Sequence, residues 1–490
     1  MSEEVLFVRA RFLLPMTKTD GKLDRIEDGY ILAGKSIKEI GQYSDEIGKR
    51  IIEDYGSNLK VLGNPRDVVR FMDLEMQNGV ILPGFVKGHG HDHESVLIGL
   101  ARDLPLTDWL DEAINIFTGF LHENQDSLTH EFGKSPYYIA YIKARLDDIS
   151  FGITSALTHH CNFNKYHVDE LVAANENAGT RIFIAVGSQD RHYDSRILDT
   201  PEEAIERMNL LETKHGHLDR TTIIPGPDQL FSNGPELLKA LKKWANDHNK
   251  LLHIHSSEEP ATTKWFTEEY GMTPIEYADS IQFLDDRTML AHQVNNTDHD
   301  LDLIQNSGAM VVHNPLANTI LGSGMPPVLE MIKRNIPICF STDGSGSADN
   351  QNMLSAARLA SQYQKAFHQD AKVLNAEESL SRITSHPAKI LRLNAGTLEV
   401  GKDSDFLLFD LSKPNVTPTR LETVVENLIW ASAGNEIKHV VANGQILVEN
   451  YEFKTLDLNE VLTDIQNLAD SFEIYKAEIK TKSETGVRSN

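Results

Sequence analysis

The stretch Pro83-Gly84-Phe85-Val86-Lys87-Gly88-His89-Gly90-His91-Asp92-His93 decides the interpretation of the whole chain. It follows the apolar, branched run 79–82, which is typical of a buried β-strand. Side chains two residues apart share one face of an extended chain, so His89 and His91 point the same way. Two imidazoles on one face form half of a site for zinc, iron, manganese or cobalt. Histidine pairs also occur as ordinary surface residues, so the metal hypothesis depends on later parts of the chain.

Short apolar runs alternate with amphipathic segments downstream of this stretch. Seven runs follow the histidine strand as predicted strands, at 154–157, 181–186, 222–224, 251–254, 289–291, 309–312 and 336–340. The helix-like segments are 107–117, 136–149, 168–178, 201–215 and 235–248. Eight strands alternating with helices over about 310 residues predict an α/β fold of the (β/α)₈ TIM-barrel type. A doubly wound open sheet is the alternative, but no GxGxxG pattern follows the first strand to support it.

The two ends of the chain have a different, β-rich texture. Short apolar runs bounded by glycine and charge recur before residue 82, and the polar stretch 44–70 is expected to be an insertion or long loop. From Gly396 the β texture returns, with a hairpin predicted around the Asn443-Gly444 turn. We expect both ends to form one small composite β-sheet domain. The predicted organisation is 1–82 and 396–456 for that domain, 83–395 for the barrel, and 457–490 for an acidic amphipathic helix and tail.

Composition excludes several classes of partner. The chain has 490 residues, 40% of them hydrophobic, and a formal net charge of −25. This charge disfavours nucleic acid and anionic membrane surfaces, and no apolar run approaches the length of about 20 residues that a membrane span needs. There are only two cysteines, and the N-terminus lacks the pattern of a signal peptide. We therefore expect a soluble, cytoplasmic protein.

Reactive side chains recur where the predicted strands end. His255 follows one strand with Glu258 three residues later, His292 ends the next strand, and Asp343 follows the last one. The loops at the carboxyl ends of barrel strands share one mouth, so these groups are expected to meet. His89, His91, His255 and Asp343 would supply three nitrogens and one oxygen to a metal and leave a position for water. Taken singly, His292 could be a core histidine, Asp343 a turn residue and Glu258 a solvated carboxylate.

These motifs, in this order, resemble the metal-dependent amidohydrolase superfamily. The similarity is to its mononuclear aminohydrolase branch, which includes cytosine, guanine, 8-oxoguanine and S-adenosylhomocysteine deaminases and triazine hydrolases. It covers nearly the whole chain. The motifs that carry it are 83–86 with His89 and His91, 102–106 with Trp109 and Leu110, His255 with Glu258, His292, 313–315 with Asn318 and Gly322, 342–344 with 352–354, and 396–410.

The resemblance implies a role for each motif residue. His89, His91, His255 and Asp343 look like the ligands of one divalent metal ion, zinc in the first place with ferrous iron as the alternative. Glu258 looks like the proton carrier to the substrate. His292 looks like the group that polarises the attacked carbon and orients water, and Asp343 would also accept the water proton. Binuclear relatives carry a lysine on the fourth strand, whereas 223–227 contains none, which favours one metal.

The positions expected to contact substrate are less well defined. They are His93, Trp109, His159, His160, Gln229 and Asn318. His93 is an extra histidine beside the metal motif, and it could instead support the ligands. His159 and His160 resemble a histidine pair that lies near substrate in 8-oxoguanine deaminases, but they could equally cap the second strand.

Several positions depart from the family pattern. Lys87, Gly88 and Gly90 replace residues common around the histidine motif, and Gln229 stands where relatives often carry a histidine that contacts substrate. The identity of the substrate therefore cannot be transferred from any one relative.

The predicted function is hydrolytic deamination of a nitrogen heterocycle such as an aminated purine, pyrimidine, pterin or triazine. The first alternative is hydrolysis of another bond on the same scaffold, such as an alkylamino, chloro or cyclic amide group. The last alternative is a non-catalytic scaffold homologue, although such proteins normally lose ligands and every ligand position is filled here. The expected partner is a small heterocyclic substrate, and the resemblance implies a homodimer or larger homo-oligomer.

Overall fold

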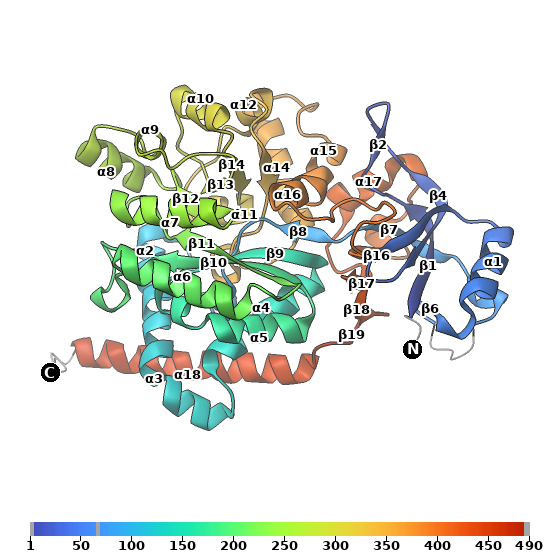
Figure 1. The fold of residues 1–490 in the computed structure, drawn as a ribbon, viewed down its shortest axis with the longest axis horizontal. Coiled ribbons are helices and arrows are strands. Elements are labelled where there is room, and N and C mark those ends of the chain that lie inside the picture. Colours follow the sequence, from blue (N-terminus) through green and yellow to red (C-terminus); the bar gives the residue numbers. More distant parts are fainter. Residues whose placement is uncertain (1–3, 65–68, 485–490) are drawn as a thin grey trace.

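The computed structural model describes residues 4–64 and 69–484. Two four-stranded parallel sheets form its centre (Figure 1). The first has the order β11-β10-β9-β8, with β8 (Phe85–Lys87), β9 (Ile153–His160), β10 (Arg181–Ser188) and β11 (Thr221–Pro227). The second has the order β12-β13-β14-β15, with β12 (Leu252–Ser256), β13 (Thr288–His292), β14 (Met310–His313) and β15 (Ile338–Phe340). Each of the eight predicted strands overlaps one of these, so the α/β class is confirmed.

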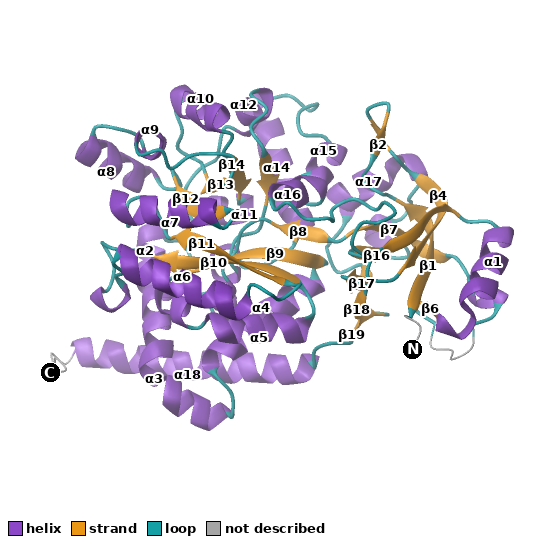
Figure 2. Cartoon of the chain, in the orientation of Figure 1, coloured by secondary structure: helices purple, strands orange, loops and turns teal. Residues whose placement is uncertain are grey.

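Helices separate these strands along the chain and surround them in space (Figure 2). They include α4 (Pro136–Ser150), α5 (Val168–Ala178), α6 (Pro201–His215), α7 (Pro235–Asp247), α8 (Pro260–Tyr270), α9 (Pro274–Ser280), α10 (Asp298–Ser307), α11 (Pro315–Ile320), α12 (Val328–Lys333) and α14 (Met353–His368). Because helices cover them, β9 and β10 are buried along their whole length. Local signals fix the helix starts: Thr200 and Glu203 form a capping box at α6.

One predicted helix is longer and less regular than expected. The segment predicted at 107–117 begins as α2 (Leu106–Trp109), passes through a π-helical turn (Leu110–Ile114) and continues as α3 (Asn115–Phe132). Wide turns of this kind often occur near functional sites. Here the turn places Trp109, Leu110 and Ile114 against the cavity described below.

The two chain ends combine in a nine-stranded sheet. Its order is β19-β18-β17-β16-β7-β1-β4-β5, with β6 paired to β1. The N-terminal strands are β1 (Val5–Leu13), β4 (Ile26–Ala33), β5 (Ile37–Gln42), β6 (Leu59–Val61) and β7 (Gln77–Pro83), and the C-terminal ones are β16 (Phe406–Asp410), β17 (Ile437–Ala442), β18 (Gln445–Glu449) and β19 (Glu452–Phe453). Antiparallel pairing of β16 with β7 joins the two ends. The hairpin predicted at Asn443-Gly444 is confirmed, since β17 pairs with β18 there.

The prediction of an irregular stretch at 44–70 was wrong. It contains α1 (Asp45–Tyr55), capped by the Ser44 side chain, and β6. The sequence pattern did not predict this helix, because charged residues occupy most of its length and Ile51 is its one fully buried large side chain. Residues 65–68 of the stretch lie outside the described part of the chain.

The predicted C-terminal helix is present as α18 (Leu458–Glu484), which packs against α3 and α4 (Figure 1). Its buried face carries Val461, Ile465, Leu468 and Phe472. Within residues 4–64 and 69–484, no helix has both the length and the apolar character required to cross a membrane.

The two parallel sheets approach each other at both edges. On one side, Gln229 and His255 form an isolated parallel bridge between the loop after β11 and strand β12. On the other side, the Ser341 hydroxyl accepts a hydrogen bond from the His89 amide (3.1 Å) and donates one to the His89 carbonyl (2.7 Å). The carboxyl ends of all eight strands therefore face a common region, where the candidate site lies.

Candidate active site

The two histidines that follow β8 lie in a tightly packed interior. His89 and His91 follow β8 and are both buried. Gly90 between them has no space for a side chain, since a Cβ there would lie 3.1 Å from the Asp343 carbonyl oxygen and closer still to the Lys87 side chain. Glycine therefore avoids crowding between this loop, the Lys87 side chain and the loop after β15.

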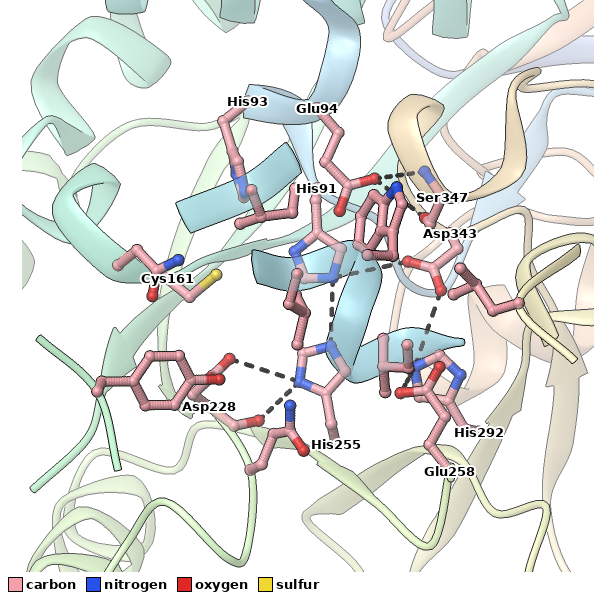
Figure 3. A pocket seen from close by; sticks show the side chains of 18 residues that line it. His91, His93, Glu94, Cys161, Asp228, His255, Glu258, His292, Asp343 and Ser347 are labelled. Atoms are coloured by element: carbon pink, nitrogen blue, oxygen red, sulfur yellow. Dashed lines mark hydrogen bonds and ion pairs between the residues drawn. The ribbon is translucent and has the colours of Figure 1, made fainter. Parts of the chain in front are cut away.

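Four donor groups converge where the sequence predicted a metal. His89 Nε2 lies 3.1 Å and His91 Nε2 3.6 Å from Asp343 Oδ1. His255 and His91 face each other across the site (Figure 3), and their Nε2 atoms lie 3.2 Å apart. The donors of His89, His91 and His255 are all within 4.8 Å of one another. The structure thus brings together β8, β12 and β15, which are far apart in sequence.

Hydrogen bonds to the backbone determine which ring nitrogens carry protons. His91 Nδ1 lies 3.0 Å from the His159 carbonyl oxygen, and His255 Nδ1 lies 2.6 Å from the Asp228 carbonyl oxygen. A carbonyl can only accept, so both protons sit on Nδ1 and both Nε2 atoms present lone pairs. Two lone pairs 3.2 Å apart repel each other unless a cation lies between them. Burial lowers the pKa of His91 to about 3, which keeps the ring neutral as a ligand must be. The donor set therefore fits a divalent metal ion.

His292 carries its proton on the other nitrogen. The Asn318 and Asn314 amides donate to His292 Nδ1 at 3.0 and 3.3 Å, so Nδ1 accepts and the proton lies on Nε2. That Nε2 lies 3.3 Å from Glu258 Oε2 and 3.8 Å from Asp343 Oδ2. His292 is therefore oriented to donate a hydrogen bond rather than to bind a metal. Asn318, which is predicted to contact substrate, lies against His292 and donates to its Nδ1.

The backbone at two of these residues is strained. His292 and Asp343 adopt φ angles of 74° and 76°, in the left-handed region that side chains other than glycine rarely enter. Such conformations persist where the surrounding structure enforces them, and they gather at active sites.

Two buried carboxyl groups face the site. Burial, reinforced by the nearby Asp343, raises the pKa of Glu258 well above its usual value. The raised pKa favours the protonated carboxyl, the form that can donate a proton. Burial and Asp343 also raise the pKa of Glu94 to about 8. The Glu94 carboxyl accepts hydrogen bonds from the amide (2.9 Å) and hydroxyl (3.0 Å) of Ser347.

A cavity opens in front of these groups (Figure 3). It is lined by three of the six residues predicted to contact substrate, His93, Trp109 and Gln229. His159 and His160 do not line this cavity, and His159 packs beside His255 with ring centroids 4.6 Å apart. A wider outer chamber adjoins the cavity and shares Leu106, Leu110, Asn162, Tyr193 and Gln229 with it.

Sequence reasoning missed several residues of the cavity wall. They are Glu94, Cys161, Asn162, Tyr193, Asp228 and Ser347. Asp228 carried a usable signal, because it directly follows the fourth parallel strand just as the predicted groups follow theirs. Tyr193 and Ser347 lie in segments with no comparable pattern.

Comparison with known proteins defines the class of this fold and site. A family model described as the amidohydrolase family matches residues 80–447, and the chain belongs to that family. The resemblance stated from the motifs is thereby confirmed. The family is metal-dependent, and its fold implies a TIM-type barrel.

Individual relatives are deaminases by name. The chain is 30% identical over 375 residues to a 5-methylthioadenosine/S-adenosylhomocysteine deaminase of Thermococcus kodakarensis, covering 76% of this chain and 84% of that one. It is 28% identical over 430 residues to a 5'-deoxyadenosine deaminase of Methanosphaera stadtmanae, covering 87% and 96%.

Solved structures share the fold at lower identity. A zinc-bound adenosine deaminase from Xanthomonas campestris superimposes with a TM-score of 0.79 at 20% identity, covering 96% of this chain and 98% of that one. An atrazine chlorohydrolase from Arthrobacter aurescens TC1, complexed with zinc, has a TM-score of 0.79 at 23% identity and covers 95% and 100%.

Proposed function

We propose that the protein is a divalent-metal-dependent aminohydrolase that removes an amino group from a nitrogen heterocycle and releases ammonia. The observation that carries this proposal is the opposite hydrogen bonding of the histidines in one cavity. His91 and His255 present Nε2 lone pairs, whereas His292 presents an Nε2–H beside Glu258, whose pKa burial raises well above its usual value. Hydrolytic deamination needs a metal-binding set, a hydrogen-bond donor at the attacked carbon and an acid for the ring nitrogen. Relatives named as deaminases support the same reaction.

His89, His91, His255 and Asp343 would hold one metal ion, with zinc as our first choice and ferrous iron as the alternative. When bound, the metal supplies the Lewis acidity that makes water a nucleophile near neutral pH. The remaining chemistry falls to side chains. Asp343 accepts one water proton as the oxygen adds to the amino-bearing carbon, and the Glu258 carboxyl protonates the ring nitrogen. His292 Nε2–H donates a hydrogen bond to the attacking oxygen and holds it in line.

Breakdown of the tetrahedral intermediate completes the reaction. Asp343 passes its proton to the amino group, which leaves as ammonia when the carbon–nitrogen bond breaks. The second proton of the former water returns to Glu258, so both carboxyl groups recover their starting states. The product carries a ring carbonyl and a protonated ring nitrogen in place of the amino group.

The two connected chambers favour a substrate larger than a free base. The inner cavity reaches His292 and Glu258, and the outer chamber offers further volume lined by Phe163 and Phe231. An aminated purine with an attached sugar and 5' substituent would fill both. The relatives named as deaminases of 5'-substituted adenosines support this choice.

Ammonia release by the metal-loaded protein tests the proposal. The panel contains free aminated purines, pyrimidines, pterins and triazines beside adenosine, 5'-deoxyadenosine, 5'-methylthioadenosine and S-adenosylhomocysteine. We expect release from a purine nucleoside, and its loss in Asp343→Ala. If only a free base released ammonia, the proposed nucleoside substrate would be wrong, but the proposed deamination reaction would stand. Silence across the panel with metal bound would overturn the deaminase proposal, and chloride or alkylamine release from a triazine would then identify a different hydrolase.

We also propose that the two parallel sheets close into one (β/α)₈ barrel and that the nine-stranded sheet is a separate small domain. The hydrogen bonds between His89 and Ser341 and the bridge at Gln229 support closure. Slow hydrogen exchange at the His89 amide, equal to that of central strands, is the expected result. Light scattering tests the accompanying proposal of a homodimer or larger assembly.

A further inference from the structure

A second group of metal-binding side chains lies beside the catalytic set and has no role in the proposed reaction. It consists of His159 at the end of β9, Cys161 two residues later, and Asp228 directly after β11. One ligand atom from each lies within 4.8 Å of the other two. We propose that these three residues form a second metal site, selective for a thiophilic divalent cation such as zinc or cadmium. This site shares no residue with the catalytic set and goes beyond the proposed deaminase activity.

His159 is the group that most clearly lacks a partner. Its side chain has no exposed surface, and neither ring nitrogen has a hydrogen-bond partner among the described residues. Its Nδ1 lies 3.9 Å from Asp228 Oδ1, which is too long for a hydrogen bond. A buried polar group left without a partner is costly, so an unsatisfied imidazole between a thiol and a carboxylate indicates a ligand.

The chemistry of the three side chains suits a thiophilic ion. Thiolate, imidazole and carboxylate are all zinc ligands, and the sulfur favours soft cations over magnesium or calcium. Bonds of about 2.0 Å to nitrogen and about 2.3 Å to sulfur place tetrahedral ligand atoms about 3.5 Å apart. Separations of up to 4.8 Å therefore need only small side-chain rotations to close around an ion. As the sulfur–metal bond forms, the thiol proton passes to solvent.

Charge balance allows this ion to sit close to the catalytic metal. The Cys161 thiolate and the Asp228 carboxylate together cancel the charge of one divalent cation, so the filled site is neutral. His91 and His93 form another group with Cys161 within 4.8 Å, but that arrangement would take His91 from the catalytic set. The combination with His159 and Asp228 leaves the catalytic ligands untouched.

The position of the site connects it to the substrate cavity. Cys161 and Asp228 both line the cavity, and Figure 3 shows them on the same side of the His91–His255 pair. An ion bound there would narrow the space available to substrate. Excess zinc is therefore expected to inhibit the enzyme through this site.

Metal binding by the full-length protein tests the proposal independently of deaminase activity. The protein is saturated with Co²⁺ or Cd²⁺, freed of excess metal and analysed for metal content and for thiolate-to-metal charge-transfer absorption. We expect about two ions per chain and a thiolate band in the wild type. Cys161→Ser and Cys161→Ala should each retain about one ion and lose the band. Asp343→Ala should lose the catalytic ion and keep the band, which separates this site from the catalytic one.

Cys339 provides the matched control. It is the only other cysteine, lies buried on β15, and belongs to none of the candidate metal groups in the described part of the chain. Cys339→Ser should keep both the second ion and the band. One ion per wild-type chain, two ions without a thiolate band, or a second ion that survives in both Cys161 variants would each overturn the proposal. Two Cys161 variants are used so that a folding defect in one, detected by thermal melting, does not decide the outcome.

Discussion

Buried imidazoles occur in two regions of this molecule, and their hydrogen bonding differs. In the nine-stranded sheet, His439 on β17 is fully satisfied: Nε2 lies 3.1 Å from Gln77 Oε1, and Nδ1 accepts from the Asn450 amide at 3.1 Å. At the carboxyl ends of the parallel strands, His89 and His159 have no hydrogen-bond partner on either ring nitrogen among the described residues. A satisfied polar group specifies structure, whereas an unsatisfied one is held ready for a ligand.

Asp343→Asn should have the largest effect of these variants on activity, without lowering the stability of the metal-free protein. The amide keeps the size of the side chain but removes the negative charge that faces His89 and His91, so both metal retention and proton transfer fail. We expect kcat/KM for the best substrate of the panel to fall by about 10³-fold or more. Because the site is held ready for a ligand, the metal-free variant should unfold with a free energy equal to or above that of the metal-free wild type.

The matched control for this prediction is Asp286→Asn at an exposed ion pair, which should leave both quantities unchanged. A metal-free Asp343→Asn protein that is clearly less stable would show that Asp343 serves the fold, and the distinction between the two regions would break down.

Lys87→Met tests the buried charges beneath the histidine strand, where polar groups are paired. Lys87, Arg145, Asp92 and Asp148 form a neutral quartet with side chains no more than 4% exposed, and Lys87 Nζ lies 3.4 Å from Asp148 Oδ1. Removing one cation leaves a net negative charge without solvent. The free energy of unfolding should fall by about 3 kcal/mol.

Urea denaturation measures this effect, with Lys243→Met as control. Lys243 pairs with Asp247 at 2.6 Å on an exposed helix face, and its loss should cost less than about 0.5 kcal/mol. If the two variants lost equal stability, burial of the quartet would have no energetic consequence.

Asn318→Ala should lower the catalytic rate without changing the metal content of the protein. Loss of the amide that donates to His292 Nδ1 frees the ring to turn or to move its proton, so His292 no longer presents a fixed Nε2–H. We expect kcat to fall by about 10- to 100-fold, with KM and metal content retained. Asn318→Asp is the sharper variant, because an acceptor in the same place draws the proton to Nδ1. An active Asn318→Asp enzyme would contradict the assigned tautomer.

The sequence predicted the strands and the converging residues because both follow from local pattern. Short apolar runs of three to six residues mark the strands, and His255, His292 and Asp343 stand at or just after the ends of such runs. Helix α1 escaped prediction because its core contribution is almost confined to Ile51, while its length is charged. Its place depends on the aromatic cluster of Phe7, Tyr30 and Tyr43, which forms only in the folded sheet.

What the sequence could not supply is the partner of each polar group. His91 takes its tautomer from a carbonyl 68 residues away, at His159, and no spacing rule encodes that contact. For the same reason the sequence did not predict the hydrogen bond that Asn318 donates to His292. The proton placement that distinguishes a ligand from a donor is therefore a property of the fold, although the residue types are visible in the chain.

His439→Gln should have the smallest effect of these variants, and it tests the nine-stranded sheet, where both ring nitrogens of the buried histidine have hydrogen-bond partners. Burial, aided by Lys438 and Lys60, lowers the pKa of His439 to about 3, whereas an unfolded histidine has a pKa of about 6.5. Between these values the unfolded chain binds more protons than the folded one, so this residue makes stability fall as the pH drops from about 6.5 towards 3. Glutamine cannot titrate. The slope of the free energy of unfolding against pH should therefore be steeper for the wild type than for the variant, by up to about 1.4 kcal/mol per pH unit.

The measurement is the free energy of unfolding of metal-free protein at several pH values between about 4.5 and 6.5. His299→Gln, at a side chain that is 63% exposed, is the control and should reproduce the wild-type slope. If His439→Gln also reproduced it, the hydrogen bonds to Gln77 and Asn450 would not hold the ring neutral. The strongest pH dependence would then belong to the strand-end histidines, whose unsatisfied nitrogens would be titrating with the fold rather than waiting for a metal.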